Sequence, residues 1–79
     1  MSQQLMIEYR TAFVESDPAF ADFWYECDNK EFYTSMEEAV AESDIIHDWR
    51  SGASDLTSVR LLNMMTGKRT YIAPNVLIR

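Results

Sequence analysis

The sequence predicts an α+β fold in which an antiparallel β-sheet of four to five strands carries one α-helix on a face. Three observations support this class: apolar residues alternate along residues 5–15, helix start and stop signals enclose residues 34–52, and a turn separates two apolar runs near the C-terminus. The expected order of elements is β-β-β-α-β-β. Seventy-nine residues with two glycines and two prolines fit one compact domain over residues 1–79.

The first strand is expected in LMIEYRTAFVE (5–15), where side chains alternate between two faces. Leu5, Ile7, Tyr9 and Phe13 fall on one of these faces. Glu8 and Arg10 fall on the other face, beside Met6, Ala12 and Val14.

Two hairpins are expected to complete the sheet. The first pairs residues 23–27 with residues 31–33 around DNK, in which Asn29 accepts a left-handed backbone. The second pairs residues 56–65 with residues 69–73 across TGK, and the apolar tail NVLIR that follows is expected to dock on the domain.

The helix is expected to begin at Thr34 or Ser35, because each hydroxyl residue is followed three positions later by Glu37 or Glu38 in a capping box. Gly52 is the expected left-handed stop. One side of this helix is predicted to pack on the sheet, and its residues are Met36, Ala39, Val40, Ser43 and Ile46.

Charge is distributed unevenly along the chain. Residues 15–55 contain twelve carboxylates but only Lys30 and Arg50, whereas residues 56–79 contain four basic residues and no acid. An acidic surface attracts basic partners and repels phosphates, so direct binding of nucleic acid is not expected. The same charges also fit a solvated surface without a partner.

No catalytic or metal site is predicted. Cys27 and His47 are each the sole residue of their type, so an internal disulfide is excluded and an activated nucleophile is not evident. Asp44, His47 and Asp48 share a helix face, but transition-metal sites usually use more than one imidazole or thiolate. We therefore expect no cofactor.

A cytoplasmic protein without membrane contact is expected. The N-terminus lacks a basic segment followed by an apolar one, and no apolar run approaches the ~20 residues of a membrane span.

The acidic helix is the predicted partner-binding surface. At 100° per residue, Glu37, Asp44 and Asp48 form one row on this helix, with separations of ~10 Å and ~6 Å along the axis. Glu38 and Glu42 form a second row. These spacings are comparable to those of phosphates in nucleic acid, so the row could occupy a basic channel.

Ile45 and Trp49 lie near this surface and suggest an apolar hot spot with an acidic rim. The alternative, which the sequence leaves open, is that both pack beneath the C-terminal tail.

The layout resembles that of small acidic phage proteins that disable host machinery. The residues that carry the resemblance are Phe23–Trp24, the helix entry Ser35-x-Glu37-Glu38-Ala39, Trp49, and the strand Thr57-Ser58-Val59-Arg60. They are similar in layout to a phage inhibitor of bacterial RNA polymerase, which implies a sheet with one helix and Arg60 as a partner contact. Anti-CRISPR proteins are similar in size and charge.

These observations lead to three hypotheses. The first is a non-enzymatic inhibitor encoded by a phage or mobile element, which blocks a basic nucleic-acid-binding site on a host protein or ribonucleoprotein; the expected target is a CRISPR effector. The second is a phage inhibitor of bacterial RNA polymerase. The third is a structural or assembly module that forms a homodimer through a sheet edge or the apolar tail.

Overall fold

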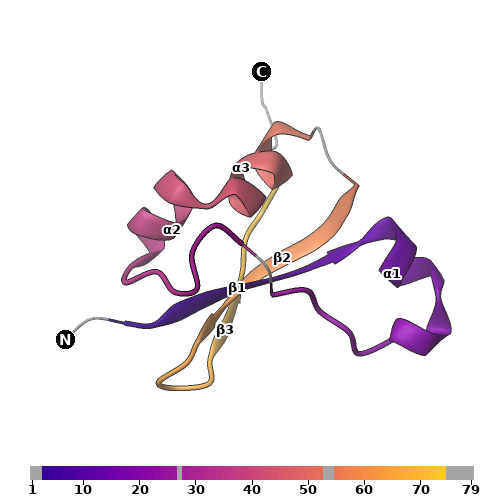
Figure 1. Cartoon of the computed structure of the whole chain (residues 1–79), viewed down its shortest axis with the longest axis horizontal. Coiled ribbons are helices and arrows are strands. Elements are labelled where there is room, and N and C mark those ends of the chain that lie inside the picture. The colour runs from indigo at the N-terminus through magenta and orange to yellow at the C-terminus, as the bar shows by residue number, and fades with distance from the viewer. Residues whose placement is uncertain (1–2, 27, 53–54, 75–79) are drawn as a thin grey trace.

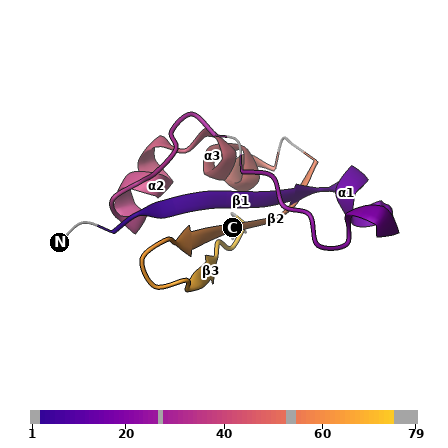
Figure 2. The ribbon, with the colours of Figure 1, turned by 60° about the horizontal axis from the view of Figure 1, so that its bottom comes forward.

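A three-stranded antiparallel sheet in the order β1-β2-β3 forms the centre of the fold. The computed structural model describes residues 3–26, 28–52 and 55–74. Helices α2 (Met36–Glu42) and α3 (Asp44–Ser51) lie across one face of the sheet, and no described helix covers the other face (Figures 1 and 2). The predicted α+β class is confirmed, but the described residues form three strands instead of four to five.

Strand β1 (Leu5–Thr11) pairs with β2 (Leu56–Asn63) along its whole length. The alternation predicted for β1 places Leu5 and Ile7 in the core, and Ile7 lies opposite Leu61. Both faces of this pair are therefore set by the period-two pattern of the sequence.

β1 is shorter than predicted because the chain turns into α1 (Ala12–Ser16). The register shifts between Arg10 and Thr11, and the Thr11 hydroxyl caps the helix by accepting from the Val14 amide at 3.4 Å. Phe13 consequently lies on α1 with 63% of its surface exposed, so its predicted place in the strand, on one face with Leu5, Ile7 and Tyr9, is wrong. The short helix η1 (Pro18–Phe20) follows.

Strand β3 (Arg69–Tyr71) forms the predicted C-terminal hairpin with β2, although both strands are shorter than expected. Gly67 in the turn has a φ of 77°, which favours glycine. The tail at residues 75–79 and Cys27 lie outside the described residues.

The predicted hairpin between residues 23–27 and 31–33 is wrong. Instead, Tyr25 forms an antiparallel bridge with Tyr9, and Tyr33 forms one with Leu5. Both ends of this segment use the free edge of β1, while residues 28–32 bulge toward α2 and α3 (Figure 1). The backbone groups at the edge of β1 are thus satisfied without a further regular strand.

The predicted helix starts and stops as expected but is broken in its middle. The Ser35 hydroxyl accepts from the Glu38 amide at 3.0 Å, and Gly52 has the expected left-handed conformation with a φ of 74°. Ser43 has an extended ψ of 123° and separates α2 from α3, so the prediction of one continuous helix is wrong.

The core lies between the sheet and the two helices. Ala39 and Ile46 from the helices are fully buried, and Ser43 is 2% exposed, so the predicted inward face of the helix is confirmed. The apolar residues of the core cluster are Leu5, Ile7, Tyr33, Ala39, Ile46, Val59, Leu61 and Ile72.

Candidate functional site

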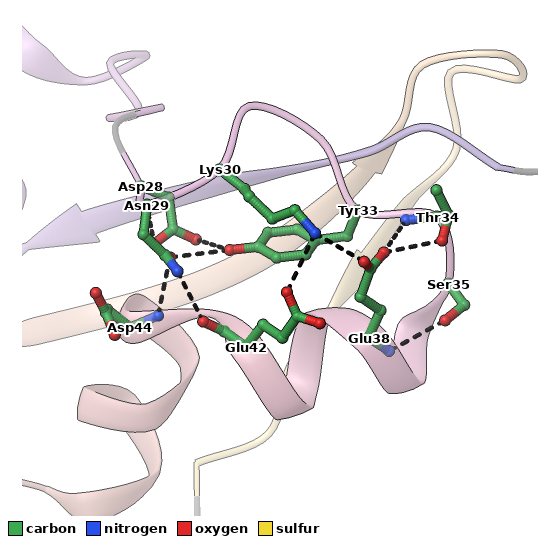
Figure 3. Close-up of polar contacts among 9 residues, drawn as sticks. All are labelled: Asp28, Asn29, Lys30, Tyr33, Thr34, Ser35, Glu38, Glu42 and Asp44. Carbon is green, nitrogen blue, oxygen red and sulfur yellow. Dashed lines mark hydrogen bonds and ion pairs between the residues drawn. The ribbon is translucent and has the colours of Figure 1, made fainter.

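A polar network joins the loop before α2 to the junction between α2 and α3 (Figure 3). Ser43 is at its centre. The Ser43 hydroxyl accepts from the Ile46 amide at 3.1 Å, which caps α3, and donates to Oδ2 of Asp28 at 2.7 Å. This side chain therefore has a partner both as donor and as acceptor, which makes a break at this position favourable.

The Asn29 amide bridges the two helix ends. Its Nδ2 donates to the Glu42 carbonyl at 2.9 Å, and its Oδ1 accepts from the Asp44 amide at 3.2 Å (Figure 3). Helix ends leave backbone carbonyls and amides without intrahelical partners. One side chain thus satisfies a group on each side of the break.

Tyr33 closes the network from inside the domain. Its hydroxyl lies 2.9 Å from Oδ2 of Asp28 and 3.0 Å from Oδ1 of Asn29. Tyr33 as a whole is fully buried. Burial, together with the hydrogen bond to Asp28, raises the pKa of Tyr33 to about 12. The phenol is therefore neutral over the physiological range.

Lys30 neutralises part of the acidic surface of α2. Its Nζ lies 2.8 Å from Oε2 of Glu38 and 3.1 Å from Oε1 of Glu42. Glu38 also accepts from the amide and hydroxyl of Thr34. The hydrogen bond from Lys30, followed by those from Thr34, lowers the pKa of Glu38 to about 2, and both carboxylates raise the pKa of Lys30.

Three of the predicted contact residues, Glu37, Asp44 and Asp48, are exposed. Within residues 3–26, 28–52 and 55–74, no ion pair involves any of them. They lie on two helices separated by Ser43, so they do not form the continuous row that the sequence predicts for one straight helix. Helices α2 and α3, which together form the helical layer, nevertheless carry exposed carboxylates on both sides of the break.

Ile45 and Trp49 are partly buried against the core. Nε1 of Trp49 donates to the Ile72 carbonyl at 2.8 Å, just after β3. Both side chains thus pack inward, and the tail at residues 75–79, beneath which the alternative places them, lies outside the described residues.

Arg60 lies apart from the carboxylates of α2 and α3. Its strand neighbour Leu61 points into the core, so Arg60 points to the face that no described helix covers (Figure 2). Its side chain is 13% exposed, its Nε lies 2.6 Å from Oε1 of Glu8, and its guanidinium lies 3.5 Å from the Trp24 ring centroid. Arg60 therefore does not join the acidic layer in a single surface, as the sequence-based site requires.

The sequence did not reveal the roles of Asp28, Asn29 and Tyr33. DNK has the composition of a turn, and a turn satisfies Asn and Asp locally. The signal that could have drawn attention to it is Ser43, a capping residue in the middle of a helix pattern. The acceptor of its hydroxyl, Asp28, lies fifteen positions away in the sequence, where no local rule reaches.

The described residues contain no group of three or more His, Cys, Asp or Glu side chains placed to hold a metal ion. No helix in the described part of the chain is long and apolar enough to cross a membrane. The chain is a small acidic α+β domain in which hydrogen bonds from Asp28 and Asn29 hold the loop before α2 against the junction of α2 and α3. No protein-family model, curated protein or solved structure matches the chain.

Replacing Asn29 by alanine is expected to lower the free energy of unfolding by about 1.5 kcal/mol. The substitution removes the partners of the Glu42 carbonyl and the Asp44 amide, and each hydrogen bond contributes about 0.5–1.5 kcal/mol. Urea denaturation provides the measurement. Glu31→Ala in the same exposed loop is the matched control, and equal stability losses in both variants would contradict the bridging role.

Proposed function

We propose that this protein acts by binding and not by catalysis, and that α2, α3 and the loop before them form an acidic surface that occupies a basic site on another macromolecule. The observation that carries the proposal is the set of exposed carboxylates Glu37, Asp44 and Asp48, to which no described cation is paired. Residues 28–52 hold seven carboxylates but only Lys30 and Arg50.

The network around Ser43 supports this proposal because it fixes the surface before a partner arrives. Asn29 and Asp28 tie the loop to both helices, and the Lys30 contacts hold the loop against α2. A prearranged set of charges loses little conformational entropy on binding. Such a surface can compete with a polyanion for a basic channel.

The target that best fits this chemistry is a basic nucleic-acid-binding surface on a host complex. A CRISPR effector fits this description, because it is a ribonucleoprotein that holds nucleic acid in a positively charged channel. A bacterial RNA polymerase is the alternative suggested by the resemblance in layout. Arg60 is not part of the proposed surface, because Glu8 and Trp24 already hold its guanidinium on the other side of the sheet.

Replacing Glu37, Asp44 and Asp48 together by lysine is expected to weaken binding to such a target by about a hundredfold. Three exposed contacts of about 1 kcal/mol each are lost, and 1.4 kcal/mol corresponds to a tenfold change in affinity. The measurement is competition with labelled nucleic acid for a purified complex captured from bacterial lysate, performed at two salt concentrations.

The matched control is Asp55→Lys, set against Asp44→Lys, because Asp55 is also exposed but lies outside the helices and the loop before them. It has the same net charge, so equal losses in both variants would show that overall charge and not this surface determines binding. Thermal melting by circular dichroism checks that both variants are folded. Binding that does not weaken at high salt would also contradict the proposal, because exposed charges are screened.

Self-association is the second candidate function. Strand β3 forms an edge of the sheet, and Arg69, Thr70 and Tyr71 are all exposed. Exposed edges can pair with a second copy of the chain. A stable dimer in size-exclusion chromatography with light scattering, lost on Tyr71→Pro, would favour this function over the first, because alternation along β3 directs the Tyr71 amide to the free edge.

A further inference from the structure

A row of aromatic rings crosses the end of the molecule that carries α1 and η1. The centroid distances are 5.9 Å from Phe13 to Phe20, 5.8 Å from Phe20 to Phe23, 4.8 Å from Phe23 to Tyr25 and 5.2 Å from Tyr25 to Tyr9. We call these five residues the aromatic row. Tyr9 packs against the core, whereas Phe13 is 63% exposed and Phe23 is 41% exposed.

The backbone beneath the aromatic row is held in place by Arg10 of β1. Nη1 of Arg10 donates to the carbonyls of Ala21 at 2.8 Å and Phe23 at 3.2 Å, and its Nε lies 2.8 Å from Oε2 of Glu15. Arg10 is 8% exposed. A buried guanidinium thus fixes the row in position, although two of its rings lie in solvent.

Further contacts hold the two ends of residues 17–25, the segment that carries Phe20, Phe23 and Tyr25. The Asp17 side chain caps η1 by accepting from the Ala19 amide at 2.9 Å. Tyr25 exchanges two backbone hydrogen bonds with Tyr9, of 2.8 Å and 3.0 Å. An exposed apolar surface that is already ordered loses little entropy when a partner covers it.

Carboxylates flank the residues of the aromatic row in the sequence. No lysine or arginine occurs between Arg10 and Lys30, whereas Asp22 and Glu26 lie beside the exposed rings in the sequence and are themselves exposed. Within the described ranges neither of these two carboxylates forms an ion pair. An apolar centre with a charged rim is the usual arrangement of a protein-binding hot spot.

We propose that the aromatic row binds a protein segment whose apolar side chains are bordered by lysine or arginine. Exposed apolar patches on small domains mark interaction sites, and the acidic rim selects a basic neighbour by charge complementarity. Phe13 and Phe23 supply the apolar contact, and Asp22 and Glu26 supply the contacts to the cations.

This surface is separate from the acidic layer of α2 and α3. Tyr9 pairs with Tyr25 near the C-terminal end of β1, and Phe13 lies on α1, which follows that end. Helix α2 lies near the N-terminal end of the strand (Figure 1). Phe13→Ser and the lysine variants of α2 and α3 therefore test different sites, and one proposal can fail while the other holds.

The test uses an amphipathic peptide of leucine and lysine added to ¹⁵N-labelled protein. Amide shifts in the NMR spectrum are expected to centre on residues 12–26, and Phe13→Ser is expected to weaken binding at least tenfold, as for a hot-spot residue. Met65→Ser is the control, because Met65 is 54% exposed but lies in the turn between β2 and β3. Phe23→Ser is a second variant at the site.

Four outcomes would overturn the proposal. The first is equal binding of the same peptide with each leucine replaced by serine, which would leave charge alone as the cause. The second is equal binding of a leucine–glutamate peptide, which would exclude the acidic rim. The third is a shift map centred on residues 36–51. The fourth is concentration-dependent shifts at the aromatic row without peptide, which would identify a second copy of this chain as the occupant.

Discussion

Glu8→Gln is expected to lower the free energy of unfolding by about 3 kcal/mol, a large share of the stability of a small domain. The Glu8 side chain is 5% exposed, and its Oε1 lies 2.6 Å from Nε of Arg60 and 3.2 Å from Nε of Arg69. The Arg60 guanidinium, stacked 3.5 Å from the Trp24 ring centroid, would then remain buried without a carboxylate. Removing one partner of a buried ion pair is costly because the other charge loses its compensation.

Urea denaturation measures this loss, and Glu42→Gln is the matched control. Glu42 also forms an ion pair, with Lys30, but the side chains are 50% and 42% exposed, so a loss below about 1 kcal/mol is expected. The double variant Glu8→Gln with Arg60→Met is expected to be more stable than Glu8→Gln alone. A loss at Glu8 no larger than that at Glu42 would show that this pair is not a major source of stability.

Tyr33→Ala is expected to cost about 4 kcal/mol, because it removes a fully buried aromatic side chain between β1 and the helical layer. Tyr33→Phe separates the ring from the hydroxyl. It is expected to cost about 1–2 kcal/mol, since Asp28 then loses the donor at 2.9 Å and keeps that of Ser43. Equal losses in the two variants would contradict this division.

The raised pKa of Tyr33 also predicts how stability changes with pH. Burial favours the neutral phenol, so the pKa is about 12 in the folded chain, compared with an ordinary value of 10.0. The contribution of this group to folding is complete below pH 10 and is lost as the pH rises from 10 to 12, because the unfolded chain releases the proton first. Urea denaturation across this range is expected to show a steeper loss for the native protein than for Tyr33→Phe, and identical slopes would argue against a buried phenol.

The helix signals show how far local reasoning reaches. Ser35 and Gly52 mark the two ends correctly because capping and left-handed stops depend on atoms within a few residues. The break at Ser43 was not predicted. Ser43 bonds to Asp28, and Asn29 bonds to both flanking helices, so the break depends on contacts between segments that only the folded chain brings together.

The sequence predicted the acidic character of the candidate site but not the contacts among its side chains. The acidic character of the helical layer follows from composition, and Glu37, Asp44 and Asp48 are exposed as expected. Composition could not indicate that Glu38 and Glu42 share Lys30, because the lysine comes from a loop whose path is set by Tyr33 and Asn29. The exposed aromatic row was also missed.

The sequence by itself determined the α+β class, the faces of the paired strands, the ends of the helical region and the charge asymmetry. Each of these depends on residue type and on spacings of two to four positions, which act before distant segments meet. Tertiary structure alone decided that Tyr25 and Tyr33 bridge β1, that the helix breaks at Ser43, and that Arg60 is paired while Phe13 is exposed. These outcomes depend on which remote groups satisfy a buried donor, acceptor or charge, and that competition is settled only when the chain is packed.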